Sequence, residues 1–190
     1  MTIDLDLSTL TLKKGGHSGP GDGMCLLEAA AYMAGEDWSD HPECVCTVLG
    51  SFGRNLNDVL PDDKRQLLKP LLPELLSTAA DGHAEARSYM ALDWLVRTYL
   101  PAWLVVTERI PAEVAQAIRD LAPIVDMESA AAAGALVRDA RAKAAAAWAA
   151  AGDAAWAAAR DAATQKLAPT VAELQDSAID LYTRMVRVGK

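Results

Sequence analysis

An alanine-rich stretch near the C-terminus decides the fold class. It reads Met127-ESAAAAGALVRDARAKAAAAWAAAGDAAWAAARDAATQ-Lys166, and 21 of the 34 residues from 130 to 163 are alanine. Because alanine has the highest helix propensity, this stretch predicts one long helix that needs little tertiary support. Pro169 then predicts the start of a final amphipathic helix, whose apolar residues recur at helical spacing. Together the two segments predict a long Ala-rich helix hairpin at the C-terminal end of the chain.

Two tryptophans punctuate this stretch. Trp148 and Trp156 each begin a similar eight-residue unit, and eight residues turn a helix by about 800°, so both side chains can share one broad face. The small alanine surface favours close approach of a neighbouring helix, with the tryptophans as anchors. That helix could belong to the same chain or to a second copy, so a homo-oligomer paired through the Ala-rich helix is one expectation. A Trp-lined ligand groove is the alternative.

The rest of the chain is also predicted to be mainly helical. Ile3, Leu5 and Leu7 alternate with polar residues, which predicts a short N-terminal β-strand or hairpin. Apolar spacing and proline positions predict helices over 24–34, 43–56, 84–100 and 111–121, with two short helices within 60–78. Residues 101–107 fit either helix or strand. The fold class is therefore all-α, mainly a helical bundle, with a compact part over 1–125 and the Ala-rich part over 126–190.

Charge and composition exclude several classes of protein. The chain has 18 Lys and Arg against 26 Asp and Glu, a net charge of −8, whereas binding to a nucleic-acid backbone needs a basic face. The chain contains no apolar run long enough to predict a membrane span, and its first residues do not resemble a signal peptide. The chain has only three cysteines, an odd number that does not suit a disulfide scaffold. We therefore expect a protein of a reducing compartment, which is the cytoplasm.

Histidines and cysteines gather in one segment and suggest a metal site. His17, Cys25, His41 and Cys44 fall within thirty residues, and imidazole with thiolate is the ligand set that zinc prefers. A structural zinc clip on these four residues is one hypothesis, with Cys46 a weaker candidate. The alternative is that the cysteines are small apolar residues of the core.

Cys25 and Glu28 are the candidate catalytic residues. Asp22 is a plausible N-cap for the helix over 24–34, which places Cys25 in its first turn, where backbone amides lower a thiol pKa. The start Asp22-Gly-Met-Cys25 is reminiscent of ovarian-tumour-type cysteine proteases, although only four positions match. Glu28 lies beside Cys25 on an otherwise apolar helix, so it is either on the solvated edge or paired with His17 or His41.

A wider resemblance covers roughly the first 105 residues. Its residues are Gly16-His17, Met24-Cys25, Glu28-Ala29, Tyr32, Gly35 and Trp38-Ser-Asp-His-Pro-Glu-Cys44, and it continues through Asn55-Leu-Asn-Asp58 and Leu92-Asp-Trp-Leu95. The pattern resembles an uncharacterised family of small proteins from actinobacteria and their phages. The resemblance implies a phage or prophage accessory setting, in which small proteins act by binding host components, and it implies no established activity.

The sequence thus predicts a non-enzymatic interaction protein that binds a host or defence component, with a protein partner and no nucleic-acid or membrane partner. Two alternatives remain open. One is a small hydrolase that uses Cys25 as nucleophile or a metal held by His17, Glu28 and His41. The other is an acidic decoy of nucleic acid, since residues 1–110 carry a net charge of −7, with 16 acidic and 9 basic residues.

Overall fold

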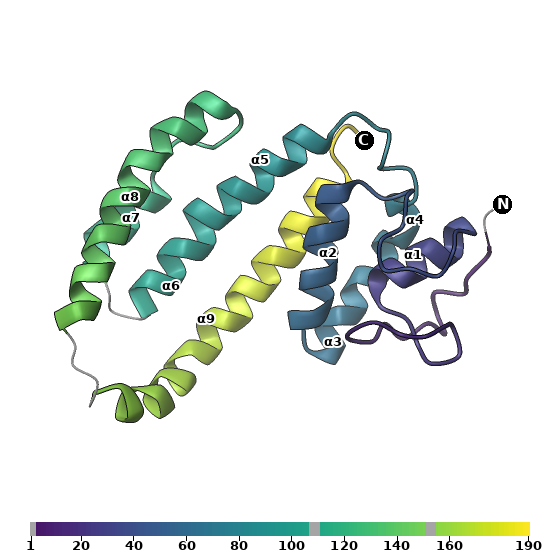
Figure 1. Cartoon of the computed structure of the whole chain (residues 1–190), viewed down its shortest axis with the longest axis horizontal. Coiled ribbons are helices and arrows are strands. Elements are labelled where there is room, and N and C mark those ends of the chain that lie inside the picture. The colour runs from purple at the N-terminus through teal and green to yellow at the C-terminus, as the bar shows by residue number, and fades with distance from the viewer. Residues whose placement is uncertain (1–2, 107–110, 151–154) are drawn as a thin grey trace. The chain divides into compact units, whose positions relative to one another are not determined.

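The computed structural model describes residues 3–106, 111–150 and 155–190, without the side chains at 141 and 143–166. These residues are mostly helical and contain no β-strand, so the all-α prediction is confirmed in its main point (Figure 1). No helix in these ranges has the length and apolar character needed to cross a membrane. The chain divides into a first unit of Met1–Ser88 with Ala178–Lys190, and a second unit of Tyr89–Ser177. This division differs from the predicted boundary at residue 125.

The first unit is built around a short buried helix. In Figure 1, α1 (Leu26–Ala34) lies beside α2 (Thr47–Val59) and α4 (Leu72–Leu75). Between α2 and α4 the chain forms α3 (Asp62–Arg65) and the 3₁₀-helix η1 (Gln66–Leu71). The core contains Tyr182 and leucines from α1, α2, η1, α4 and the last turns of α9, among them Leu26, Leu27, Leu49, Leu68, Leu72, Leu75 and Leu181.

The second unit contains a smaller core. It includes most of α5 (Ala84–Trp94), the π-helix η2 (Leu95–Tyr99), α6 (Leu100–Val106), α7 (Ala112–Arg119) and α8 (Met127–Ala150). Leu104, Ala115, Ile118 and Ala140 are buried together, and half-buried aliphatic side chains surround them. Residues 101–106 are helical, which answers the choice between helix and strand that the sequence leaves open.

The predicted N-terminal strand is not formed in the described residues. The chain turns at Asp6, whose carbonyl oxygen accepts hydrogen bonds from the amides of Thr9 and Leu10. A single parallel bridge joins Leu12 to Met24. The backbone of Leu12 is paired instead with a side chain, because the Gln66 amide both donates to its oxygen and accepts from its nitrogen, at 3.0 and 2.9 Å. A strand partner is therefore replaced by one glutamine.

The C-terminal helices begin and end at other residues than predicted. Within the Ala-rich stretch, the described residues belong to α8 (Met127–Ala150) and to the start of α9 (Ala155–Val186), and residues 151–154 lie outside the described part. Pro169 lies inside α9 at an exposed position, instead of beginning a helix. The side chains of Trp148 and Trp156 lie outside the described residues, so the oligomer and groove predicted from them stay predictions.

Candidate functional site

The loop that carries His17 is held in place by side chains from α2 and η1. The Asn57 amide donates to the carbonyl oxygen of Lys13 at 2.9 Å, and its oxygen accepts from the amide of Leu26 at 3.2 Å. The Asp58 carboxylate accepts from the amide of Gly15 at 2.9 Å. Because each partner is a side chain rather than a strand, a glycine-rich loop obtains a fixed path without regular structure.

The loop ends against a buried carboxylate. Glu28 Oε1 accepts from the backbone amide of His17 at 2.6 Å, and its Oε2 lies 2.8 Å from His17 Nδ1. Oε2 also accepts from the amide of Cys25 at 2.8 Å. The indole of Trp38 donates to the carbonyl oxygen of His17 at 2.7 Å. Of the two positions predicted for Glu28, the structure therefore shows the buried one, paired with His17.

The same contacts form the N-terminal cap of α1. Cys25, not Asp22, is the N-cap residue: its Sγ accepts from the amide of Glu28 at 3.5 Å while Glu28 accepts from its amide. This reciprocal pair is a capping box in which cysteine takes the place usually held by serine or threonine. Gly35 ends the helix with φ at 72°, the left-handed conformation that glycine adopts without strain. Cys25 and Glu28 thus define where α1 begins.

The electrostatics of this cluster favour a charged Glu28 and a protonated Cys25. Burial raises the pKa of the Cys25 thiol to about 12, and the neighbouring Glu28 charge also raises it. Burial acts to raise the pKa of Glu28, but hydrogen bonds from Cys25 and His17 outweigh it and hold that pKa below the ordinary value. A nucleophilic cysteine requires an accessible thiolate, and Cys25 is only 4% exposed. These properties are those of a structural thiol.

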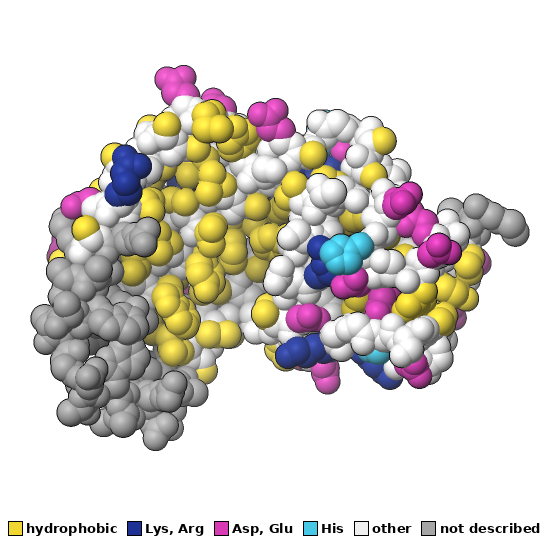
Figure 2. All heavy atoms as spheres, in the orientation of Figure 1, with side chains coloured by type: hydrophobic (Ala, Val, Ile, Leu, Met, Phe, Trp, Pro, Cys, Tyr) yellow, Lys and Arg dark blue, Asp and Glu magenta, His cyan; other side chains and the backbone are white. Residues whose placement is uncertain are grey.

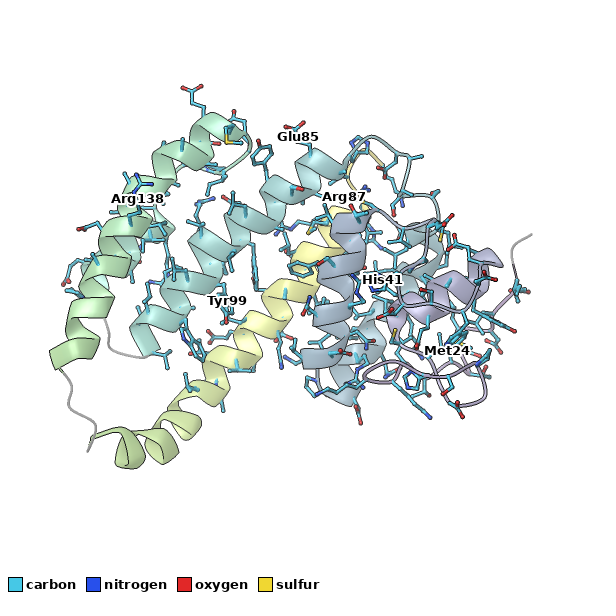
Figure 3. The ribbon with its side chains drawn as sticks, viewed as in Figure 1. Met24, His41, Glu85, Arg87, Tyr99 and Arg138 are labelled. Atoms are coloured by element: carbon cyan, nitrogen blue, oxygen red, sulfur yellow. The ribbon has the colours of Figure 1, made fainter. Side chains whose placement is uncertain are left out.

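The four predicted zinc ligands lie in different surroundings. His17 is paired with Glu28, and Cys25 caps α1. His41, labelled in Figure 3, is 68% exposed and lies 3.4 Å from Asp40. Cys44 is half-buried beside Glu36, and burial raises the pKa of its thiol to about 12. Within the described ranges, no group of three or more His, Cys, Asp or Glu side chains could hold a metal ion. The zinc clip stays a prediction, which the zinc content of the purified chain tests.

A second buried ion pair was not predicted from the sequence. Arg87, labelled in Figure 3, is fully buried and donates to the carbonyl oxygen of Met185 at 2.8 Å. It also donates through both terminal nitrogens to the carboxylate of Asp81, which lowers the pKa of Asp81 to about 2. Asp81 and Arg87 are six residues apart, whereas paired side chains on a helix are three or four residues apart. The sequence therefore gave no indication of this pair. Its role is to join the start of α5 to the end of α9.

The second unit contains a cavity of about 470 Å³. Its lining combines two guanidinium groups with one carboxylate and two hydroxyls, from Arg97, Thr98, Ala102, Arg119, Glu173, Leu174 and Ser177. None of these residues was among the candidates from the sequence. They come from η2, α6, α7 and α9. Because the first and last of these helices are far apart in the chain, no regular spacing in the sequence could predict that their residues share a cavity.

An apolar face runs along the helix of which η2 is the middle. The rings of Trp94, Tyr99 and Trp103 follow one another, with centroids 5.5 Å and 6.4 Å apart. Leu95 is 49% exposed on the same segment, and Tyr99 and Val105 are also exposed. In Figure 2, hydrophobic side chains gather over the part of the view that α5 and α6 occupy in Figure 1. Figure 3 labels Tyr99 within this face.

Comparison with known proteins adds no relative. No model of a protein family matches the chain, and neither a curated protein nor a solved structure matches it. The resemblance described from the sequence therefore stays an expectation.

Proposed function

We propose that this chain is a non-catalytic protein that acts by binding another protein through the apolar face of α5, η2 and α6. One observation carries the proposal: large apolar side chains are exposed mainly in the second unit. These are Leu95, Tyr99, Val105, Val125, Met127 and Val171, against Ile3, Val59 and Leu67 in the first unit. Contiguous exposed apolar surface on a protein marks a site of interaction.

The composition of this face supports a protein partner. Aromatic residues are enriched in the centres of protein–protein interfaces, and tryptophan and tyrosine supply much of the binding energy there. Trp94 donates its indole N–H to the Ser177 hydroxyl at 2.8 Å, and the stacked Tyr99 and Trp103 rings continue from it. The rings are therefore held in place before a partner arrives, which lowers the entropy lost on binding.

The state of the candidate catalytic residues also supports a binding role. Glu28 and Cys25 use their polar atoms to cap α1 and to hold the His17 loop. The phage or prophage setting that the sequence resemblance implies makes a host or defence component the expected partner. A hydrolase built on Cys25 would need the thiol to leave its buried position at the cap.

A matched pair of substitutions tests the proposal. Leu95→Glu places a charge in the apolar face, and Leu67→Glu places one on a leucine of the first unit that is similarly exposed, at 57% against 49% for Leu95. We expect a host protein captured by the wild type and by Leu67→Glu to be lost with Leu95→Glu. With the partner purified, affinity should fall by at least about tenfold for Leu95→Glu, which is 1.4 kcal/mol. Equal binding by both variants, or no specific complex with the wild type, would overturn the proposal.

A further inference from the structure

The cavity of the second unit has the size and the donors of a ligand site. Its volume of about 470 Å³ lies within the range of about 300–1,000 Å³ that is usual for small-molecule pockets. Leu174 and Ala102 supply apolar wall, while Arg97 and Arg119 bring guanidinium groups to it. This cavity is separate from the His17 cluster and is independent of the partner proposed above.

Arg97 is held in position from one side. Its Nη1 donates to both oxygens of Asp93, at 3.0 and 3.3 Å. Asp93 is itself fixed, because its Oδ1 accepts from the backbone amide of Ile124 at 2.8 Å. In the part of the chain that the structure describes, Arg97 Nε is buried and has no hydrogen-bond partner. Buried donors are almost always satisfied, so this nitrogen is an exception among the described residues.

The other polar groups of the lining leave donors unused. Arg119, half-buried in the last turn of α7, forms no ion pair with any described residue, although Glu173 lines the same cavity. The Ser177 oxygen accepts from Trp94, which leaves its own hydroxyl proton to donate. Guanidinium groups bind carboxylate and phosphate through planar, paired hydrogen bonds.

We propose that this cavity binds the oxyanion group of a small carboxylate or phosphate compound. Arg119 supplies a positive charge that forms no ion pair with a described residue, and the guanidinium of Arg97 supplies a second set of donors that Asp93 orients. Ser177 donates a neutral hydrogen bond. Glu173 repels the oxyanion and limits the cavity to a ligand of low charge, because the lining as a whole carries one positive charge in excess, with two arginines and one glutamate.

The Nε–Hε signal of Arg97 in a proton–nitrogen NMR spectrum of the full chain tests this proposal. Sodium acetate and sodium phosphate are titrated separately at constant ionic strength, and the signal is assigned by its loss in Arg97→Gln. We expect a saturable shift with a dissociation constant of about 1–10 mM, as suits a fragment with one anchoring group. Saturation by acetate alone would identify the ligand as a carboxylate, and saturation by phosphate alone would identify it as a phosphate. Saturation by both anions would show that the cavity recognises the oxyanion chemistry that they share.

Charge-matched variants separate this site from general attraction of anions. Arg119→Gln removes a lining charge, whereas Arg138→Gln removes the same charge from an exposed position on α8 that does not line the cavity (Figure 3). We expect affinity to fall by at least about tenfold in Arg119→Gln and to change by less than about twofold in Arg138→Gln. Glu173→Gln should bind a few-fold more tightly. A shift that never saturates with either anion, or equal losses in the two arginine variants, would overturn the proposal.

Discussion

The Glu28 carboxylate fixes the start of α1 and the path of the loop before it. It accepts from the amides of His17 and Cys25 and lies 2.8 Å from the imidazole of His17. A buried charge costs free energy unless it is hydrogen-bonded, and here three donors surround it. The sequence placed Glu28 correctly on an apolar helix and offered His17 as one of two partners. It could not choose between His17 and His41, because that choice depends on how the glycine-rich loop folds back.

We expect Glu28→Gln to lower the free energy of unfolding of the first unit by about 2–4 kcal/mol, because an amide cannot accept all the hydrogen bonds that the carboxylate accepts. Urea titration followed by the indole NMR signal of Trp38, which donates to His17, measures the loss. Glu85→Gln is the control, since Glu85 is an exposed acid in the first turn of α5 (Figure 3). Equal effects of the two substitutions would contradict the role given to Glu28.

A second prediction at the residue scale concerns acid. Hydrogen bonding to Arg87 lowers the pKa of Asp81 from 3.8 to about 2, so the folded state binds this proton more weakly than the unfolded state does. Its contribution to stability is therefore complete above pH 4 and is lost as the pH falls towards 2. We expect Asp81→Asn to be about 2–4 kcal/mol less stable than the wild type near pH 6, since Arg87 then stays buried without its partner.

The stability difference between Asp81→Asn and the wild type should shrink as the pH approaches 2, where about half of the wild-type carboxyl groups are protonated. Urea midpoints measured from pH 7 to pH 2 give both curves. Asp63→Asn provides the control, because Asp63 is exposed and forms no ion pair within the described residues. A constant difference across the whole pH range would mean that the Asp81 charge does not carry the effect.

At the scale of single elements, helices were predictable and the effect of proline was not. The helix over 84–100 and the helix over 111–121 were expected near the observed α5 with η2 and α7. Pro101 does not end the first of them. It lacks an amide hydrogen and crowds the carbonyl one turn earlier, and the chain widens there into the π-helix Leu95–Tyr99. Sequence spacing indicates a conflict at a proline but not whether the helix breaks or widens.

Pro169 offers a test of the same physics in α9. It lies inside a helix at an exposed position, where it removes one backbone hydrogen bond and contributes little packing. We expect Pro169→Ala to stabilise the surrounding turns by about 1–3 kcal/mol. Slower amide hydrogen exchange at Ala172 and Glu173 would show the gain.

Pro73 is the matched control for Pro169, because it lies in the first turn of α4, where the amide would not be bonded within the helix in any case. Pro73→Ala should change the free energy of unfolding by less than about 0.5 kcal/mol. Faster exchange near residue 169 in Pro169→Ala would show that the proline supports the helix at this point.

At the scale of the whole molecule, the C-terminal residues complete the first unit. Residues from Ala178 onward belong to it although 89 residues of the second unit separate them from Ser88. Tyr182 is fully buried there, donates to the carbonyl oxygen of Leu49 at 3.2 Å and stacks on Phe52. The sequence showed the apolar face of this last helix. Helical periodicity predicts which face of a helix is buried, but it does not predict which other helix packs against that face.

Two glycines of α2 test this long-range contact. A Cβ at Gly53 would overlap the hydroxyl oxygen of Tyr182 and lie 3.2 Å from Leu27 Cδ2, whereas a Cβ at Gly50 would meet nothing closer than Arg54 Nη1 at 3.6 Å. We expect Gly53→Ala to destabilise the first unit by about 1–3 kcal/mol through overpacking. Gly50→Ala should stabilise it by up to about 1 kcal/mol, because alanine is the better helix former. Urea unfolding of the full chain measures both.

The partner of Gly53 is identified by a double-mutant cycle. Removing the hydroxyl in Tyr182→Phe should recover part of the loss caused by Gly53→Ala, so the two substitutions together should cost less than their sum. The same tyrosine change should not couple to Gly50→Ala, since Gly50 has no Tyr182 atom near its Cβ position. Coupling at Gly53 and none at Gly50 requires that the end of α9 packs on α2, because no local effect of alanine within one helix distinguishes the two positions in this way. Simple additivity at both glycines would place the end of α9 elsewhere and remove Tyr182 from the core of the first unit.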